Sequence, residues 1–312
     1  MFGNSVLSLP VPAGKVFIGL FAVLAAASLV GRLAERGRSW EAAGNIRSFN
    51  AKVASWWGMA VLMLVMMYLG RGGMVALFAA ISFLALREFV TQVYRRRADH
   101  YAVALCFYAI LPLQYYFVAI GWYSMVAVFI PVYVFLLLPV AGCLSGDMSH
   151  FFERTAEIQW AVMVTVYCLS HVPALMDLDI RGYEGQNVLL LLFMLLVMQG
   201  GGAAAYLWRQ FVRRGSGWHG EAVCACIRAV SSAMLAAGLF WITPFTPFQA
   251  ALCGLLVSLT GSAGSGVLSA IKHNFGIRNW LPDHPQRSML DGAAGICFAA
   301  PVFFHVVRYY WG

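Results

Sequence analysis

Long runs of apolar residues recur along the whole chain and constrain its fold more than any other feature of the sequence. Of the 312 residues, 61% are apolar and only 11% are charged, and several stretches carry almost no charge. About 20 consecutive apolar residues allow a helix to cross the roughly 30 Å hydrocarbon core of a bilayer. The runs predict ten membrane spans, near residues 15–33, 54–70, 73–92, 101–120, 123–142, 158–176, 187–208, 222–243, 247–271 and 291–310.

These runs favour helices over strands. The apolar and polar alternation of a transmembrane β-barrel does not occur, and backbone polar groups in lipid must find their partners within each helix. We expect an all-α, polytopic integral membrane protein with about ten transmembrane helices, built as a single membrane domain over residues 1–312. Residues 1–180 would supply the N-terminal, lipid-facing helices, and residues 181–312 would form the C-terminal part that carries the polar motifs.

Basic residues gather in every second connection between the predicted spans. Because cytoplasmic connections are enriched in Lys and Arg, the odd-numbered connections are predicted to be cytoplasmic and both termini to lie outside. The first span is expected to remain as an anchor, since one Lys precedes the apolar run and three Arg follow it. The net charge of +8 then needs no nucleic-acid partner to explain it. The basic residues are Arg32, Arg36, Arg38, Arg47, Lys52, Arg95–Arg97, Arg154, Arg209, Arg213, Arg214, Lys272, Arg278 and Arg287.

Charged residues at two other places have alternative interpretations. Arg87 and Glu88 lie together in the third predicted span, either as a helix end whose side chains reach the interface or as a buried functional pair. A second group could share one face of a surface helix, as a solvated stretch or as a site for a divalent ion or head group. Its members are Asp147, His150, Glu153 and Glu157.

A polar run between the last two apolar stretches carries a recognisable order of residues. Ser269-Ala-Ile-Lys272-His273 is followed, after four residues, by Arg278-Asn279, then by a Pro-x-His that ends at His284, and then by Asp291. This order resembles the signature of the phosphatidate cytidylyltransferase (CDP-diacylglycerol synthase) family, in which Ser-x-hydrophobic-Lys-Arg precedes Lys-Asp, Pro-x-His and an Asp. The resemblance extends over most of the chain, and its N-terminal half is similar to a bacterial branch.

The resemblance implies a reaction between two anions at a membrane. A phosphatidate oxygen attacks the α-phosphate of CTP, which releases pyrophosphate and leaves CDP-diacylglycerol in the bilayer. Mg²⁺ held by carboxylates, together with cationic side chains, would offset the negative charge. The resemblance also implies a multi-pass protein of the bacterial inner (cytoplasmic) membrane with its site facing the cytoplasm.

Six residues receive roles through the resemblance. Lys272 would neutralise phosphate charge and Asp291 would be the catalytic carboxylate and metal ligand. Each also has an ordinary alternative, in which the basic residues anchor the protein at the cytoplasmic face, Asp291 caps a helix and His284 lies in a turn. The residues expected to bind substrate are Ser269, Arg278, His284 and Arg287.

Several carboxylates of the family pattern are absent from this chain. Gln199–Gly202 and Ser265 stand where the family has acidic or Asn-Asp residues, and Asn279 stands where it has Asp. The three glycines at 200–202 could permit close helix contact or let a phosphate approach bare backbone.

The missing carboxylates favour a degenerate, non-catalytic homologue that keeps a phospholipid- or phosphate-binding cavity and needs no metal. Two alternatives remain: an active CTP:phosphatidate cytidylyltransferase that uses Mg²⁺, and a lipid transporter or flippase. A phosphatidate-like membrane lipid is the expected ligand. CTP, a second copy of the chain in a homodimer and a partner membrane enzyme are further candidates.

Overall fold

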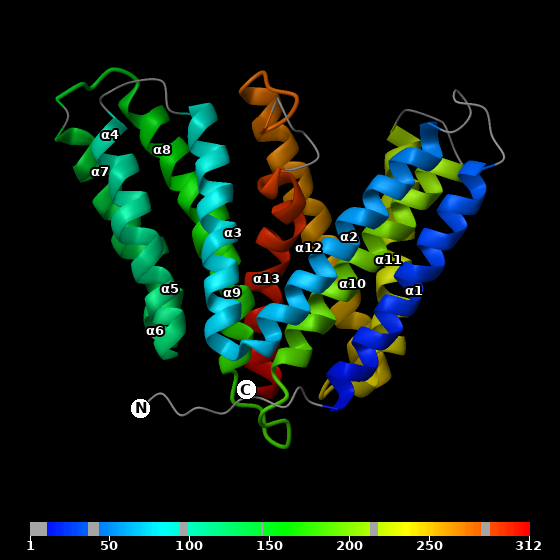
Figure 1. Cartoon of the computed structure of the whole chain (residues 1–312). Coiled ribbons are helices and arrows are strands. Elements are labelled where there is room, and N and C mark those ends of the chain that lie inside the picture. The colour runs from blue at the N-terminus through cyan, green and yellow to red at the C-terminus, as the bar shows by residue number, and fades with distance from the viewer. Residues whose placement is uncertain (1–10, 37–43, 94–98, 145, 213–217, 282–287) are drawn as a thin grey trace. The chain divides into compact units, whose positions relative to one another are not determined.

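Most of the described residues fold into helices. The computed structural model describes residues 11–36, 44–93, 99–144, 146–212, 218–281 and 288–312, and none of these forms a strand (Figure 1). Within them, nine helical stretches are long and apolar enough to cross a membrane. A shorter apolar stretch, Ala222–Gly238, lies at the place of the predicted eighth span. The prediction of an all-α polytopic membrane protein is confirmed.

The helices follow the predicted spans, with a few shifted boundaries. The second and sixth spans begin earlier than predicted, at Ile46 and Phe151, because polar residues continue these helices beyond their apolar cores. The helices are α1 (Val11–Arg36), α2 (Gly44–Tyr68), α3 (Gly70–Val93), α4 (His100–Leu105), α5 (Leu111–Ile120), α6 (Tyr123–Val128), α7 (Phe135–Cys143), α8 (Phe151–Val162), α9 (Leu169–Ala174), α10 (Val188–Leu207), α11 (Trp218–Gly238), α12 (Pro247–Asn274) and α13 (Met289–Trp311).

The helices separate into two compact units. The first consists of Met1–Met74 with Leu207–Arg214, and the second of Val75–Tyr206 with Gly215–Gly312. In the first unit, α1 and α2 pack as a hairpin: the rings of Phe21 and Trp57 stack 5.4 Å apart, and Trp57 Nε1 donates a hydrogen bond to Ser28 Oγ. The polar site residues that the structure describes all belong to the second unit.

In the second unit, three pairs of helices join through wider, π-helical turns. These turns are Cys106–Ile110 between α4 and α5, Phe129–Val134 between α6 and α7, and Met163–Cys168 between α8 and α9. Each lies at or shortly before a proline, Pro112, Pro131 or Pro173. Proline lacks the N–H that would bond to the preceding turn, and a local widening of the helix accommodates its ring.

Small residues bring α10, α11 and α12 close together. A Cβ at Gly201 of α10 would lie 2.0 Å from Ser232 Oγ of α11, and one at Gly254 of α12 would lie 2.5 Å from the Cβ of Ala236. Membrane helices approach this closely where small residues meet, since there is no water to drive their association. Gly201 therefore serves close helix contact, the first of the two interpretations of the glycine triplet.

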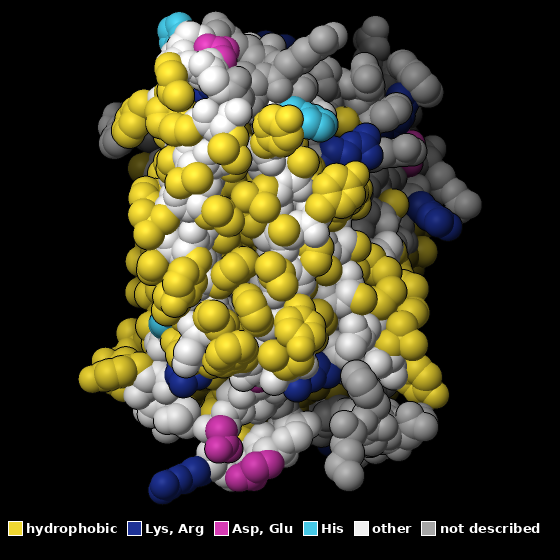
Figure 2. Space-filling view, turned by 90° about the vertical axis from the view of Figure 1, so that its left-hand side faces the viewer, with side chains coloured by type: hydrophobic (Ala, Val, Ile, Leu, Met, Phe, Trp, Pro, Cys, Tyr) yellow, Lys and Arg dark blue, Asp and Glu magenta, His cyan; other side chains and the backbone are white. Residues whose placement is uncertain are grey.

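One face of the molecule shows how the chain meets the bilayer. Figure 2 shows a broad band of hydrophobic side chains across the middle of this face, with charged side chains toward its two ends. Exposed apolar side chains in α4–α7 and their π-helical turns include Leu136 and Tyr108. A surface of this kind is suited to lipid rather than water.

Candidate functional site

Lys272 and Asp291 meet between two helix ends in the second unit. Lys272 lies in the last turn of α12 and Asp291 in the first turn of α13. The Lys272 ammonium donates a hydrogen bond of 2.7 Å to Asp291 Oδ1, and the two side chains are 21% and 33% exposed. Each charge also suits its helix end, since cations stabilise a C-terminus and anions an N-terminus. The fold thus joins two of the residues that the sequence selected.

Asp291 is not the residue that caps α13. Ser288 is the N-cap, and its hydroxyl accepts a hydrogen bond from the backbone N–H of Asp291. The interpretation of Asp291 as a helix cap is therefore wrong, because the serine three residues earlier takes that place. The Asp291 carboxylate is left to pair with Lys272.

A third carboxylate, Glu88 of α3, holds the start of α13. Its Oε2 accepts hydrogen bonds from Ser288 Oγ (2.8 Å) and from the N–H of Leu290 (3.1 Å), and its Oε1 accepts one from the N–H of Met289 (2.9 Å). Glu88 is 9% exposed, whereas its neighbour Arg87 is exposed. The expectation that both side chains reach the interface is wrong for Glu88, because three donors satisfy its charge inside the protein.

An aromatic cluster fixes the loop that follows α12. Trp280 is buried, its ring stacks on Phe89 of α3 at 5.0 Å, and Phe275 packs edge-on against both rings. Gln92 Nε2 donates a hydrogen bond to the Trp280 carbonyl. This part of the loop is therefore anchored to α3 and carries Arg278, which is exposed.

The other predicted site residues are not all brought together. Ser269 lies exposed on α12, three residues before Lys272, so the two side chains share a helix face. His284 and Arg287 lie outside the described residues. The structure therefore joins Lys272 with Asp291. Ser269 and Arg278 lie within six residues of Lys272 in the sequence. His284 and Arg287 stay predictions.

Among the described residues at the ends of α12 and α13, Asp291 is the carboxylate left for a Mg²⁺ ion, and its Oδ1 already contacts Lys272. Asp291 already holds the Lys272 ammonium, and Glu88 is occupied by three donors. Within the part of the chain that the structure describes, no three His, Cys, Asp or Glu side chains gather as metal ligands. Mg²⁺ is usually bound through one or two carboxylates together with substrate phosphates and water, so these residues alone would hold it weakly.

An ion-pair cluster holds the loop between α7 and α8 in place. Arg154 is 9% exposed; it pairs with Asp99 at 3.1 Å and donates hydrogen bonds to the carboxylate and carbonyl of Asp147. His150 has a left-handed backbone conformation and α8 begins only at Phe151. The predicted helical face is therefore wrong for Asp147, which lies in the loop and anchors Arg154.

We expect the Asp147 cluster to make stability depend on acid pH. Hydrogen bonds from the side chain and then the backbone of Ser149, followed by Arg154, lower the pKa of Asp147 below its ordinary value. A lowered pKa means that the stabilisation is complete above the unfolded pKa of about 4 and is lost as the pH falls below it. In thermal unfolding of the detergent-solubilised protein, the wild-type advantage over Asp147→Asn should shrink below about pH 4. A constant difference from pH 7 to 3 would contradict this assignment.

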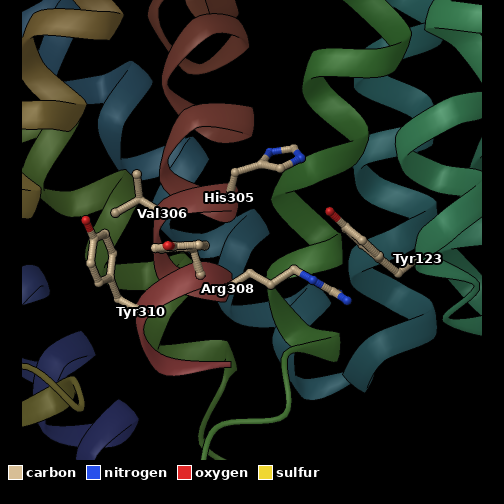
Figure 3. A pocket seen from close by; sticks show the side chains of 6 residues that line it. Tyr123, His305, Val306, Arg308 and Tyr310 are labelled. Atoms are coloured by element: carbon tan, nitrogen blue, oxygen red, sulfur yellow. The ribbon is translucent and has the colours of Figure 1, made fainter.

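A pocket at the other end of α13 contains groups that the sequence analysis missed. It has a volume of about 580 Å³ and is lined by Tyr123, His305, Val306, Arg308, Tyr309 and Tyr310. The guanidinium carbon of Arg308 lies 3.3 Å from the centre of the Tyr123 ring. Figure 3 shows Arg308 and His305 extending from α13 toward the side of Tyr123. The three-residue spacing of His305 and Arg308 could have indicated this polar face.

The pocket borders a buried histidine. His171 of α9 is fully buried, its Nδ1 lies 2.8 Å from the Tyr167 carbonyl, and its ring lies 5.4 Å from that of His305. Its Nε2 has no hydrogen-bond partner among the described residues. This end of α13 therefore combines a cation, two imidazoles and tyrosine hydroxyls, about 25 Å along the helix from Asp291.

Two comparisons with known proteins found a match over most of the chain. The sequence model of the cytidylyltransferase family matches residues 50–310. An uncharacterized protein of Escherichia coli (strain K12), YnbB, is 31% identical over 306 residues, which cover 95% of this chain and 98% of the relative. No solved structure matches the chain. Both matches span nearly the whole sequence, and the chain belongs to the cytidylyltransferase family.

Proposed function

We propose that this protein binds a phosphate-bearing membrane lipid at the Lys272 end of α12 and α13, and does not carry out metal-dependent nucleotidyl transfer. The observation that carries the proposal is the ion pair of Lys272 with Asp291. It presents a partly exposed ammonium group between two helix ends, and it engages Oδ1 of the carboxylate that the resemblance assigns to a metal.

The N–H donors of Lys272 that Asp291 does not use suit a phosphate. An ammonium group has three N–H donors, and Asp291 takes one of them. The exposed hydroxyl of Ser269 is one helical turn away on the same face of α12. Charge-assisted hydrogen bonds from these groups would hold a phosphate monoester such as that of phosphatidate. The predicted orientation puts this end at the cytoplasmic face of a bacterial inner membrane, where such a lipid has its head group.

Transfer from CTP would need more positive charge than these residues provide. The nucleophile and the nucleotide are both anions, and enzymes that join such partners offset their charge with metal ions and several cations. Here the charge of Lys272 is already balanced by Asp291, and Glu88 is used to hold α13. Binding without turnover is the simpler outcome of this arrangement.

The first test measures lipid binding. Lys272→Ala in lipid nanodiscs should weaken saturable binding of phosphatidate by about 10- to 100-fold, since a hydrogen bond between charged groups contributes about 1.5–3 kcal/mol. Lys15→Ala is the matched control, because Lys15 is exposed near the start of α1, and it should bind like the wild type. Unchanged binding by Lys272→Ala would contradict the proposal.

Turnover assays separate the alternatives. Wild-type protein given CTP, Mg²⁺ and phosphatidate should release no pyrophosphate. Release that disappears when Lys272 and Asp291 are both replaced by Ala would show an active cytidylyltransferase instead. Movement of a labelled lipid between the leaflets of proteoliposomes would favour the transport alternative.

A further inference from the structure

Arg228 lies within the apolar part of α11. The apolar stretch is Ala222–Gly238, and Arg228 has six of its residues on one side and ten on the other, which corresponds to about 9 Å and 15 Å of helix. A charged side chain at this depth is costly, and such residues in membrane proteins usually face a partner or a polar cavity. The contacts of Arg228 therefore indicate whether the protein itself supplies a partner for its charge.

The protein supplies only part of what this guanidinium can bind. Its Nη1 donates a long hydrogen bond of 3.4 Å to Ser262 Oγ of α12, whose own hydroxyl donates to the Ser258 carbonyl. Among the described residues, no Asp or Glu pairs with Arg228. A guanidinium has five N–H donors, so most of them remain available for a ligand.

Small residues lie beside the Arg228 side chain. On α10, Gly201 lies against it: a Cβ there would be 3.3 Å from the Arg228 Cγ and 2.9 Å from its carbonyl oxygen. On α12, Ser262 lies one turn from Ser265. Arg228 itself is partly exposed. The Arg228 side chain thus passes the bare backbone of Gly201 at its Cγ, and its guanidinium reaches a hydroxyl group of α12.

The residues beside Arg228 differ from those of the family pattern. By the resemblance, Gly201 and Ser265 stand where the family signature has acidic or Asn-Asp residues, and Ser262 lies one turn before Ser265. In this chain these positions carry no charge. The side chain of Arg228 instead lies against Gly201 and donates a hydrogen bond to Ser262. A guanidinium among carboxylates would compete with a metal, whereas a guanidinium without them is itself the group that attracts an anion.

We propose that Arg228 binds the phosphate of a membrane lipid directly, without a metal ion, in the interior of the α10–α11–α12 cluster. The planar fork of arginine donates two parallel hydrogen bonds to phosphate oxygens, which suits it to this ligand better than lysine. Because Arg228 lies about 9 Å of helix inside the apolar stretch Ala222–Gly238, a lipid whose acyl chains remain in the bilayer can bring its phosphate to this side chain from the nearer end of the stretch. This inference rests on the proposed function and adds a second cation, deeper than Lys272.

The test uses phosphatidate binding in nanodiscs with and without a chelator. Wild-type binding should be unaffected by EDTA. Arg228→Gln should weaken it tenfold or more, Arg228→Lys should weaken it less, and Arg181→Gln, a loop control, should leave it unchanged. Loss of wild-type binding in EDTA, or full binding by Arg228→Gln, overturns the inference.

The outcomes separate this inference from the function on which it rests. If Lys272→Ala weakens binding and Arg228→Gln does not, the proposed lipid site is supported and the proposed role of Arg228 is contradicted. If neither weakens binding, both fall. Displacement of phosphatidate by inorganic phosphate at matched concentration would overturn the assignment to a lipid and assign a free anion.

A stability measurement distinguishes ligand binding from a structural role. Without lipid, Arg228→Met should unfold at the same temperature as the wild type or higher, because it removes an unpaired charge from the membrane interior. A clearly lower unfolding temperature would mean that Arg228 holds α11 to α12 and would overturn the inference.

Wild-type protein provides a check that needs no variant. Arginine-specific dicarbonyl labelling, mapped by mass spectrometry, should show Arg228 protected by phosphatidate and Arg181 not. Equal labelling of Arg228 with and without phosphatidate contradicts the inference.

Discussion

Replacing Glu88 by Ala should destabilise the protein more than any other exchange of a charged residue near the site. The change removes the acceptor for Ser288 Oγ and for the N–H groups of Met289 and Leu290, and it leaves these donors unpaired in a buried place. An unsatisfied buried donor costs about 1–3 kcal/mol. Since some donors will find water, we expect a total loss of about 3–5 kcal/mol in the free energy of unfolding.

Arg87→Ala is the matched control for this prediction. Arg87 is the adjacent residue on α3 and is exposed, so its replacement should change stability by less than about 0.5 kcal/mol. Glu88→Gln should fall between the two, because the amide oxygen can still accept part of the hydrogen bonds. Thermal or denaturant unfolding in detergent measures all three, and equal stability of Glu88→Ala and Arg87→Ala would show that the helix start does not depend on this carboxylate.

The contrast between Glu88 and Lys272 shows which parts of the site could be predicted from sequence. Apolar run lengths predict the spans, because a bilayer sets the length of a helix. The proximity of Lys272 to Asp291 follows from a family order that places both at the ends of neighbouring helices. Nothing local indicates the role of Glu88, because its partners are some 200 residues away and hydropathy treats it as a charge near a helix end.

The same reason explains the residues that the sequence analysis overlooked. Trp280 lies in a short polar loop, where a buried aromatic residue is unexpected, and only the packing of Phe89 against it shows why it is buried. Arg228 lies within an apolar run, and its polar contribution disappears when hydropathy is averaged over a window of that length. Both depend on contacts between helices, which composition and periodicity do not contain.

The glycine triplet provides a prediction in which two neighbouring positions should respond in opposite directions. Glycine to alanine usually stabilises a helix by about 1 kcal/mol, because alanine has the higher helix propensity. Gly202 should follow this rule, since a Cβ there meets nothing within 4 Å. Gly202→Ala should therefore raise stability by up to about 1 kcal/mol.

Gly201→Ala should instead destabilise the protein by about 1–3 kcal/mol, as overpacking does. Its Cβ would lie 2.0 Å from Ser232 Oγ and 2.9 Å from the backbone carbonyl oxygen of Arg228. The serine hydroxyl cannot simply rotate away without losing its hydrogen bond to the Val197 carbonyl, and the backbone oxygen cannot move without shifting α11. Unfolding of the two variants side by side is the measurement, and a stabilised Gly201→Ala would mean that α10 and α11 do not approach as closely as described. Because the same substitution would push α11 and Arg228 away from α10, it should also weaken lipid binding, while Gly202→Ala should not.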